Sequence, residues 1–464
     1  MIKDVLARPV RNDADIERLL LSRVRDDPRP YAEREAFAGR AVSALLERLG
    51  NPHRGLSCIH IAGSKGKGSV ALMCEHLLQH SGARTGTFTS PHLCRWNERI
   101  RIDGREVDTR TLAQTLDDMR PHLAALDEAG DEWAPSFFDV LTATALSLFA
   151  QENCDRVVIE TGLGGLFDAT NVVTPLACCI TSIELEHTDK LGDTVHAIAR
   201  HKAGIIKRAT PVVTALFADS AQAVIEQQAK QLGSREWRQG RDWHIEPTHS
   251  DTLSQRIEYT RAAQQGLDAQ SSAFTLPHPA AHMATNAGLA ITVLAAAGWP
   301  VKPDALSDCH LPARAQVLRE SPRIIVDSAH TEASLQALAQ TLHQWPAGER
   351  CFVISATLGK SLHALAALLH DADGVWVTRA DPVRSTPAAT VAARLVTLVA
   401  GLKPRVFEQP EAAFEDAEAR ISSDAILCVC GSVYLAGAAL RYWQTSDWQT
   451  SDWQTSDAQG EKAS

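Results

Sequence analysis

A glycine-rich segment near residue 63 has the composition of a loop that binds phosphate. It reads Gly63-Ser64-Lys65-Gly66-Lys67-Gly68-Ser69, follows an apolar run at 59–62, and precedes apolar residues at helical spacing from Val70. The loop is therefore expected between a strand and the N-terminus of a helix. Backbone N–H groups and the helix dipole would then point at one spot and stabilise an anion there. Lys67 would reach terminal phosphates and a hydroxyl would face Mg²⁺, so the segment predicts a nucleotide phosphate site.

The segment matches the general phosphate-loop pattern only in part. In G-x-x-x-x-G-K-[ST] the first glycine falls at Ile61 of this chain, and the hydroxyl after the lysine falls at Gly68, so only Gly66-Lys67 fits strictly. A turn without function is the alternative, because glycine is common in tight turns. The strand before the loop and the helix after it favour the phosphate site.

Two further polar groups stand at the ends of predicted buried strands. Glu160 ends the predicted strand at 156–160, and His187 follows the predicted strand at 178–183. Open parallel sheets bind ligands at the carboxyl ends of their strands, which makes both residues candidate Mg²⁺ ligands. A solvated glutamate and an ordinary surface histidine are the alternatives.

The alternation of strands and helices predicts an α/β protein with two domains. A parallel-sheet ATPase domain with the phosphate loop is expected over 1–302, and a smaller Rossmann-like α/β domain over 303–443, with the boundary in a segment rich in Pro and Asp. A long apolar helix should begin after Ser136, with Asp139 completing a capping box. The segment 444–464 repeats Gln-Thr-Ser-Asp-Trp, which cannot bury a core, so a disordered tail is expected.

Composition excludes several classes of partner. The 464 residues carry a formal net charge of −10, which argues against broad binding to nucleic acid or anionic membranes. No apolar h-region follows Met1 and no apolar run is long enough to span a bilayer. The ten cysteines show no zinc-ligand spacing and are expected to be reduced core residues. A cytoplasmic protein, monomeric and acting on small molecules, is expected.

Several segments together resemble motifs of the folylpolyglutamate and dihydrofolate synthases, members of the Mur-ligase-like family of ATP-dependent amide ligases. The loop 63–69 resembles their G-T-N-G-K-G-S, and residues 89–93 resemble S-S-P-H-L. Further matches are L-G-N-P-H at 49–53, E-x-G-L-G-G-R-x-D-A-T-N at 160–171, D-H-T at 186–188, E-K-A-G-I at 201–205, H-x-x-x-N-A at 282–287, L-P-G-R-x-Q at 311–316, D-x-A-H-N at 327–331 and G-S-x-Y-L at 431–435. The resemblance covers roughly residues 40–440. It implies ADP-forming ligation of glutamate to dihydropteroate or folates through an acyl phosphate, in folate biosynthesis and one-carbon metabolism.

The resemblance also implies roles for individual residues. Catalytic roles are implied for Lys67, His187 and Lys202, whose counterpart in the family is often carbamylated. Two Mg²⁺ ions are implied, with ligands among Ser90, Glu160 and His187. Substrates are expected near Pro91, His92, Phe138, Asp168 and Asn171. ATP is expected near Gly63, Ser64, Gly66, Lys67, Gly68, Ser69, Asn286, Arg314, Asp327 and His330, with Arg314 on a phosphate and Asp327 on the ribose.

The chain departs from the family pattern at a few positions inside these motifs. Leu166 replaces an arginine, Thr331 an asparagine, Glu186 an aspartate, and Ser64-Lys65 a Thr-Asn pair. If the missing arginine bound a substrate carboxylate, another cation such as Lys190 or Arg95 would have to replace it. A ligase of the same fold acting on a non-folate carboxylic acid therefore stays open. A nucleotide-binding protein without ligase activity is disfavoured, because it would need no set of catalytic lysines and metal ligands.

Overall fold

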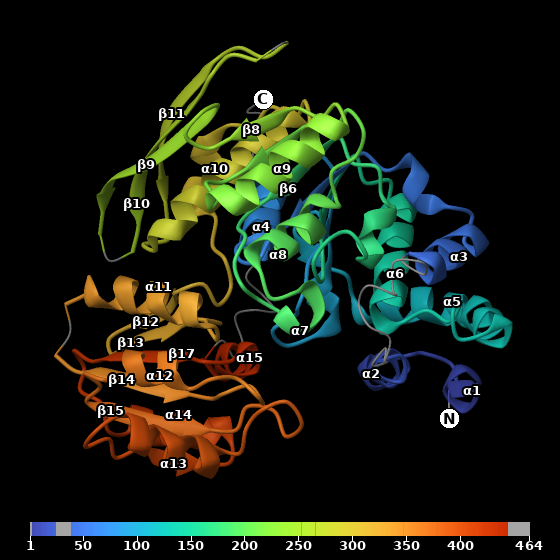
Figure 1. Cartoon of the computed structure of the whole chain (residues 1–464). Helices are drawn as coiled ribbons and strands as arrows, with labels where there is room; N and C mark the ends of the chain where they lie inside the picture. The colour runs from blue at the N-terminus through green and yellow to red at the C-terminus, as the bar shows by residue number, and fades with distance from the viewer. Residues whose placement is uncertain (1, 25–38, 252, 265, 347, 444–464) are drawn as a thin grey trace, which may run out of the picture. The chain divides into compact units, whose positions relative to one another are not determined.

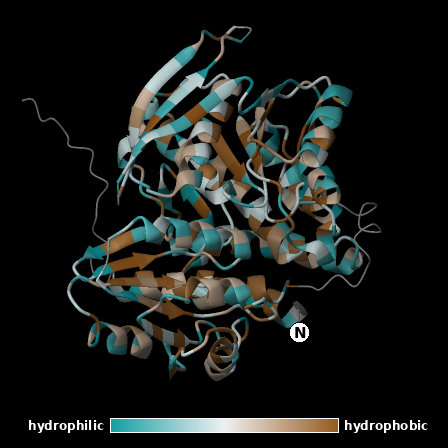
Figure 2. Ribbon diagram, turned by 60° about the vertical axis from the view of Figure 1, so that its left-hand side comes forward, coloured by the Kyte–Doolittle hydropathy of each residue, from teal (hydrophilic) through white to brown (hydrophobic). Residues whose placement is uncertain are grey.

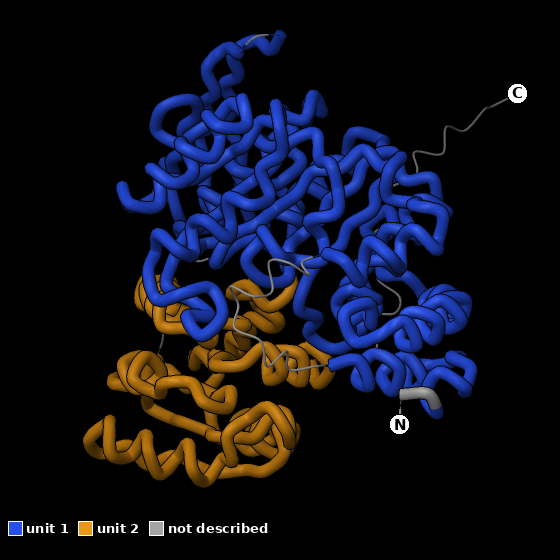
Figure 3. The backbone as a smooth tube through the Cα atoms, turned by 45° about the vertical axis from the view of Figure 1, so that its right-hand side comes forward, with its two compact units in different colours: residues 1–311 blue, residues 312–464 orange. Residues whose placement is uncertain are grey.

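The chain forms two compact units, residues 1–311 and 312–464 (Figure 3). The computed structural model describes residues 2–24, 39–251, 253–264, 266–346 and 348–443. The units divide later than the predicted 302/303 boundary. Residues of the helix η5 (Pro303–Asp308) belong to unit 1, because Leu306 is buried in the same apolar cluster as the preceding helix. The predicted disordered tail 444–464 lies outside the described residues.

Unit 1 is built on an eight-stranded sheet in the order β4-β3-β2-β5-β1-β6-β7-β8 (Figure 1). The strands are β1 (Cys58–Ala62), β2 (Thr85–Phe88), β3 (Ile100–Ile102), β4 (Arg105–Glu106), β5 (Arg156–Glu160), β6 (Ala177–Ile180), β7 (Val212–Thr214) and β8 (Glu236–Arg238). Neighbours from β2 to β8 pair in parallel, whereas β3 and β4 are antiparallel at one edge. The predicted parallel sheet is confirmed. The carboxyl ends of β1, β5 and β6 consequently lie side by side.

Helices cover both faces of this sheet, which explains why β1 and β5 are largely apolar. Ile59 and Ile61 pack with α4 (Lys67–Gln79) and α10 (Ala281–Ala296), whereas Val157 and Ile159 pack in the cluster that contains α6 (Phe137–Gln151). Figure 2 shows hydrophobic residues concentrated in the strands of the sheets. The other helices of unit 1 are α1 (Ile2–Leu6), α2 (Asp13–Leu21), α3 (Arg40–Arg48), α5 (Thr109–Ala129), α7 (Thr188–Leu191), α8 (Val195–Ala203) and α9 (Asp219–Gln231).

The start of α6 confirms the predicted capping box. Ser136 Oγ accepts the backbone N–H of Asp139, and the Asp139 carboxylate accepts the backbone N–H of Ser136 at 2.8 Å. These bonds satisfy N–H groups that a helix leaves without intrahelical partners.

Strand β3 is only three residues long. Residues Trp96–Arg99 form a 3₁₀ turn, and β3 begins only at Ile100. The Glu98 carboxylate accepts the backbone N–H groups of Leu93, Cys94 and Arg95, each at 2.6 Å. This local bonding competes with strand pairing before Ile100, where the strand begins.

A small antiparallel sheet joins unit 1 between β8 and α10. Its strands are β9 (Trp243–Ser250), β10 (Gln255–Arg261) and β11 (Gln270–Leu276), in the order β11-β10-β9. Tyr259 and Trp243 are buried on the side that faces α10, and Tyr259 Oη lies 3.0 Å from Thr292 Oγ1.

Unit 2 has its own sheet in the order β12-β13-β17-β14-β15-β16, parallel except for β12. The strands are β12 (Gln316–Glu320), β13 (Arg323–Val326), β14 (Arg350–Ile354), β15 (Gly374–Thr378), β16 (Arg405–Phe407) and β17 (Ile426–Cys430). The helices are α11 (Glu332–His343), α12 (His363–Leu368), α13 (Ala388–Leu398), α14 (Pro410–Glu418) and α15 (Val433–Trp443). This arrangement confirms the predicted second α/β domain.

The cysteines are free thiols, and all but Cys94 are buried. Within the described ranges, no helix is both long enough and apolar enough to cross a bilayer.

Candidate functional site

The glycine-rich loop lies between β1 and α4 and is fastened to the segment that follows β6. The backbone N–H of Ser64 donates to the Ser182 carbonyl at 2.9 Å, and the N–H of Lys65 donates to Ser182 Oγ at 2.8 Å. Gly63 has φ of 153°, and a Cβ there would collide with Thr181 Oγ1. The loop therefore needs glycine at this position because the neighbouring segment approaches its backbone closely.

Gly66 ends the loop in a left-handed conformation with φ of 82° and no side-chain cap on α4. A Cβ at Gly66 would lie 2.5 Å from Oδ1 of Asn286, a buried residue of α10. The structure thus brings Asn286 beside the loop. The first N–H groups of α4 have no side-chain cap at Gly66, which makes this end of the helix suited to an anion.

Lys67 is the first residue of α4, and its Nζ donates to the Gly63 carbonyl at 2.9 Å. The side chain thus folds back over the loop. Gly68 and Ser69 continue the first turn, where Ser69 is buried and Gly68 is half-buried. Six of the predicted nucleotide-binding residues lie together in this loop and turn: Gly63, Ser64, Gly66, Lys67, Gly68 and Ser69.

Glu160 lies at the carboxyl end of β5 and is only 2% exposed. One carboxylate oxygen accepts the backbone N–H of Ser90 at 2.9 Å, and a Cβ at Gly68 would lie 3.5 Å from the same oxygen. Ser90 follows β2, the other neighbour of β5. Two predicted metal ligands, Ser90 and Glu160, are therefore adjacent to each other and to the first turn of α4.

The segment after β6 carries Glu186 and His187. His187 is exposed, has φ of 45° and directly precedes the short helix α7. Glu186 lies between two lysines: its Oε1 accepts a hydrogen bond from Lys202 Nζ at 2.9 Å, and its Oε2 lies 3.5 Å from Lys65 Nζ. Two departures from the family pattern, Lys65 and Glu186, thus form an ion pair that the motifs did not predict.

Lys202 is fully buried near the end of α8. Burial and the nearby Lys67 cation lower the pKa of Lys202 to about 8, although the Glu186 carboxylate opposes the shift. Burial alone would raise the pKa of Glu186, but Lys202 and Lys67 outweigh burial and the net shift is downward. The buried amine is therefore easier to deprotonate than an ordinary lysine.

Asp168 and Asn171 hold the loop after β5 in shape. The Asp168 carboxylate accepts the backbone N–H groups of Leu163 at 2.8 Å and Thr170 at 3.0 Å, while burial raises the pKa of Asp168. Asn171 Nδ2 donates to the carbonyl groups of Leu166 and Gly204. The bonds of both predicted substrate residues run within this loop and to the end of α8, so they shape the loop.

Two residues that the motifs did not single out complete this loop. His60 of β1 is buried, and its Nε2 lies 2.8 Å from Thr170 Oγ1, which also bonds Asp168. Lys207 Nζ donates to the Asn171 carbonyl at 2.9 Å and to Asn171 Oδ1 at 2.7 Å. A histidine inside an otherwise apolar strand was the available signal for His60, because a buried polar group needs a partner.

Leu166 is 37% exposed and packs closely against Gly204, where any Cβ would collide with the leucine side chain. Asn171 links Leu166 to a cation: its Nδ2 donates to the Leu166 carbonyl, and its Oδ1 accepts a hydrogen bond from Lys207 Nζ. Arg95 instead donates to Glu106 at 2.8 Å. Lys190 is exposed on α7.

Phe138, Pro91 and His92 lie on segments beside β2 and β5. The centroid of the Phe138 ring lies 5.7 Å from that of Phe88, and the ring fills the space that a Cβ on Gly162 would need. His92 Nδ1 accepts a hydrogen bond from Arg99 Nε at 2.9 Å, which leaves its proton on Nε2 in the neutral ring. The Ser90–Pro91 peptide bond is cis, and Pro91 is exposed.

In unit 2 the predicted nucleotide residues gather around the start of β12 and the end of β13. Both Asp327 oxygens accept backbone N–H groups, one from Ala315 at 2.6 Å and one from Ala329 at 2.7 Å. Burial raises the pKa of Asp327, and the Arg314 guanidinium opposes that shift. His330 Nδ1 lies 2.9 Å from the Ser328 carbonyl. Asp327 therefore ties two loops together, and a ribose would have to share an oxygen already bonded to an N–H.

The side chains of Thr331 and Arg314 make hydrogen bonds within unit 2. Thr331 caps α11 with Ser334 in reciprocal bonds, so its side chain performs a structural task. Arg314 Nη1 donates to the Ala313 carbonyl at 3.0 Å and to Ser328 Oγ. An arginine has five N–H donors, so others stay available to a phosphate.

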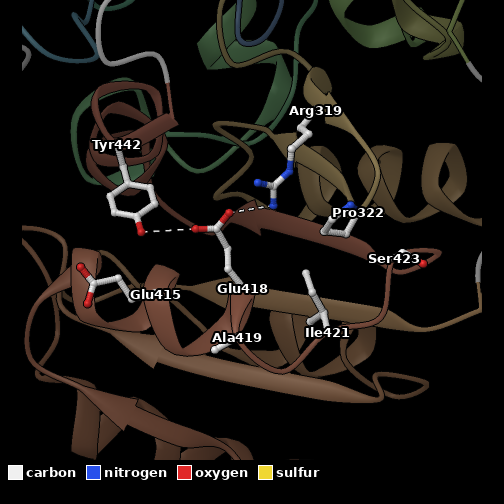
Figure 4. A pocket seen from close by; sticks show the side chains of 8 residues that line it. All are labelled: Arg319, Pro322, Glu415, Glu418, Ala419, Ile421, Ser423 and Tyr442. Carbon is white, nitrogen blue, oxygen red and sulfur yellow. Dashed lines mark hydrogen bonds and ion pairs between the residues drawn. The ribbon is translucent and has the colours of Figure 1, made fainter.

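A cavity of about 630 Å³ in unit 2 is lined by none of the predicted site residues (Figure 4). The Glu418 carboxylate lies 2.7 Å from the Arg319 guanidinium and accepts a hydrogen bond from Tyr442 Oη at 3.3 Å. Arg319 and Glu418, two of the charged residues that line the cavity, are thus paired with each other. The chemistry-bearing residues lie elsewhere.

The donor set in unit 1 fits a magnesium ion at Glu160. Mg²⁺ prefers oxygen ligands, and Glu160 offers a buried carboxylate beside the phosphate loop. His187 offers an imidazole, which suits zinc, copper, iron and nickel ions better than Mg²⁺. Glu160 and the Ser90 hydroxyl are thus the better match to the predicted ion.

Family models match both units. Residues 61–294 match the Mur ligase middle domain, and residues 313–433 match the glutamate ligase domain of Mur ligases.

Individual relatives agree with this assignment. A dihydrofolate synthase/folylpolyglutamate synthase of Bacillus subtilis is 31% identical over 417 residues, covering 85% of this chain and 92% of the relative. A probable bifunctional folylpolyglutamate synthase/dihydropteroate synthase of Halobacterium salinarum is 34% identical over 431 residues, covering 91% of this chain and 51% of the relative. The chain thus spans about half the length of that relative. The crystal structure of Mycobacterium tuberculosis folylpolyglutamate synthase complexed with ADP and AMPPCP superimposes with a TM-score of 0.82 at 29% identity, covering 96% of this chain and 99% of that one.

Proposed function

Because this chain belongs to the Mur ligase family, among its folylpolyglutamate and dihydrofolate synthases, we propose that it joins L-glutamate to dihydropteroate or to folates, with conversion of ATP to ADP and phosphate. The observation that carries the proposal is the cluster of the glycine loop, Lys67, Glu160 and Ser90 at one edge of the unit 1 sheet. A phosphate site and an acidic metal site side by side are what transfer of a phosphoryl group requires.

In the first step the acid's carboxylate oxygen attacks the γ-phosphorus of ATP. The bond between that phosphorus and the β–γ bridging oxygen breaks, and ADP leaves with the electron pair. The loop N–H groups and Lys67 hold the phosphates and offset negative charge that develops on the transferred group. A Mg²⁺ ion at Glu160 and Ser90 would supply further charge compensation when bound.

In the second step the neutral amine of glutamate attacks the acyl carbon. The carbon–oxygen bond to phosphate breaks, inorganic phosphate leaves, and the amine loses a proton as the amide forms. Water would hydrolyse the acyl phosphate, so the site has to exclude it. In this proposal His187 remains a catalytic residue and metal ligand. Pro91, His92 and Phe138 remain substrate contacts.

Lys202 keeps its proposed catalytic role, and its environment favours carbamylation. Only the neutral amine attacks CO₂, giving a carbamate and one proton, and a pKa of about 8 supplies more neutral amine at neutral pH than an ordinary lysine does. Carbon-13 NMR after exposure to labelled CO₂ should show a carbamate signal that Lys202→Gln lacks. The same spectrum from both proteins would remove this modification from the proposal.

For unit 2 the proposal keeps Arg314, Asp327 and His330 as nucleotide-binding residues. Arg314 would hold a phosphate through N–H groups other than those bonded to Ala313 and Ser328. Asn286 would join the nucleotide site through its position beside Gly66. The chain would act as a monomer in the cytoplasm.

The deciding experiment incubates the purified chain with ATP, Mg²⁺ and glutamate, with dihydropteroate in one series and tetrahydrofolate in another. Release of ADP together with a glutamylated product in either series supports the proposal. Lys67→Ala serves as the control for contaminating ligase. ADP release without glutamylated product, or product that Lys67→Ala forms equally well, contradicts it.

A further inference from the structure

The far end of α4 carries a cluster of potential metal ligands that the ligase reaction does not use. His76 and His80 stand four residues apart, so they project from the same side of the helix. Asp308, at the end of η5, faces them: Oδ1 lies 2.8 Å from His76 Nε2 and Oδ2 lies 3.8 Å from His80 Nε2. One donor atom from each residue fits within a span of 4.8 Å.

A fourth potential donor, a backbone oxygen, lies at the same place. The Ala305 carbonyl is 2.8 Å from His76 Nε2 and belongs to the same short helix as Asp308. Two imidazoles one helical turn apart, a carboxylate and a nearby carbonyl resemble the donor sets that bind zinc with three protein ligands and leave a position open.

The hydrogen bonding of His80 prepares its ring for a metal. His80 Nδ1 lies 2.9 Å from the His76 carbonyl, and a carbonyl only accepts, so the proton is on Nδ1. In the neutral ring Nε2 then carries the lone pair, and it faces the Asp308 carboxylate. Two acceptors that face each other need a cation or a proton between them. Metal-binding histidines have this same arrangement, with the other ring nitrogen bonded to a carbonyl or carboxylate.

His76 differs from His80: without a metal, its Nε2 acts as a hydrogen-bond donor. Its Nε2 lies within 2.8 Å of two acceptors, Ala305 O and Asp308 Oδ1, so it carries a proton in the bonds described. A metal would displace that proton. A simple ion pair between a protonated His76 and Asp308 is therefore the competing explanation of the cluster, and it requires no metal.

Exposure suits an ion that arrives from solvent. The side chain of His76 is 13% exposed, that of His80 42% and that of Asp308 61%. His76 is thus the least accessible ligand, whereas His80 and Asp308 are open to solvent. Since α4 rises 1.5 Å per residue, His76 stands roughly 14 Å along the helix from Lys67, so the cluster is separate from the phosphate loop.

We propose that His76, His80 and Asp308 bind a divalent transition metal ion of the zinc class, which fastens η5 to the end of α4. The ion would tie together α4 and η5, which already pack against each other in unit 1. The proposal is independent of the ligase reaction.

The test is titration of the chelator-treated full chain with Zn²⁺ alone, without ATP or Mg²⁺, followed by calorimetry. Wild type should bind one more Zn²⁺ per chain than either His80→Ala or Asp308→Asn, or bind it at least about 10-fold more tightly. His370→Ala is the matched control, because His370 pairs with Asp371 at 3.0 Å on an exposed surface, and the described residues offer no third ligand there. It should bind as wild type does.

Two further readouts separate the explanations. Zn²⁺ should raise the melting temperature of wild type and of His370→Ala but raise it less in His80→Ala. Co²⁺ in place of Zn²⁺ should give visible bands without a thiolate charge-transfer band, which excludes binding at cysteines. If wild type binds no Zn²⁺ at micromolar concentration, or if His80→Ala and Asp308→Asn bind it as wild type does, the cluster is an ion pair and the proposal is wrong.

Discussion

Lys65 and Glu186 show how two substitutions can depend on each other. Each differs from the residue that the family motif has, and the two side chains meet at 3.5 Å. Lys65 is 32% exposed and Glu186 13%, so solvent screens part of the attraction. Glu186 keeps the charge of the family's aspartate on a longer side chain, and Lys65 adds a second cation beside a carboxylate that already bonds Lys202.

A double-mutant cycle should measure this coupling. Lys65→Asn and Glu186→Gln should each lower the free energy of unfolding, and the double variant should lose less than the sum, by about 0.5–1 kcal/mol. Denaturant unfolding of the four proteins at low salt gives the value. Strict additivity would show that the ion pair contributes nothing measurable.

Lys67→Ala should abolish turnover while the fold is kept. Lys67 Nζ bonds the Gly63 carbonyl of the loop. In the proposed reaction its charge acts on phosphate, so its loss should lower kcat roughly 100-fold or more. The melting temperature should stay within a degree or two of wild type. Turnover at the wild-type rate would remove the loop from the mechanism.

Leu166→Arg tests the choice of acid. The leucine is 37% exposed, so an arginine could extend outward from the same backbone position. If folates are the natural acids, the variant should change the KM for the acid by no more than roughly 10-fold, since one added contact contributes about 1–1.5 kcal/mol. Folate-directed activity that appears only in the variant would favour a non-folate acid.

At the level of strands and loops, His60 connects β1 to the loop after β5. Burial and Lys207 lower the pKa of His60 from 6.5 to about 3. The folded state therefore keeps this ring neutral, whereas the unfolded state takes up a proton below pH 6.5. Stability from this group is present above pH 6.5 and is lost as the pH falls from 6.5 toward 3.

The His60 effect predicts a slope. Over that window His60 alone should reduce the free energy of unfolding by about 1.4 kcal/mol per pH unit. His60→Gln should show a shallower loss of stability between pH 6.5 and 4 than wild type, measured by urea unfolding. His370→Gln, an exposed histidine, should keep the wild-type slope. Equal slopes for wild type and His60→Gln would mean that the ring is not held neutral.

The sequence predicted those parts of the fold and site that local pattern controls. The phosphate loop, the α6 capping box and Glu160 at a strand end each follow from a few adjacent residues. The closeness of Asn286 to Gly66 and the Lys65–Glu186 pair could not be predicted, because they depend on how distant segments pack. The resemblance predicts Asp168 and Asn171 near substrate, whereas their hydrogen bonds in the structure shape a loop. Sequence spacing alone cannot distinguish a substrate contact from a residue that shapes a loop.

For the whole chain, the two units have separate apolar cores among the described residues. The cluster around Ile325, Phe352 and Val377 contains only unit 2 residues, and the clusters of unit 1 contain only unit 1 residues. Each sheet is also complete within one unit. Independent cores imply that each unit can fold cooperatively by itself.

Calorimetry should therefore resolve two unfolding transitions in the full chain. A fragment of residues 312–443 should melt cooperatively within a few degrees of one of them. ATP with Mg²⁺ should raise the transition that belongs to unit 1, since the phosphate loop lies there. A single transition for the full chain, together with a fragment that shows no cooperative melting, would contradict this prediction.

The position of β1 in the middle of its sheet fixes when during synthesis the nucleotide loop can be completed. β1 pairs with β5 and β6, and the loop bonds Ser182 and Glu184 and lies against Asn286. All of these partners are made after residues 63–69, so the nascent loop has no native support until much of unit 1 has left the ribosome. Non-local pairing of this kind is slow and leaves apolar strands exposed meanwhile. Chains that end before Asn286 should therefore depend on chaperones, with the strand that carries the phosphate loop as the segment to protect.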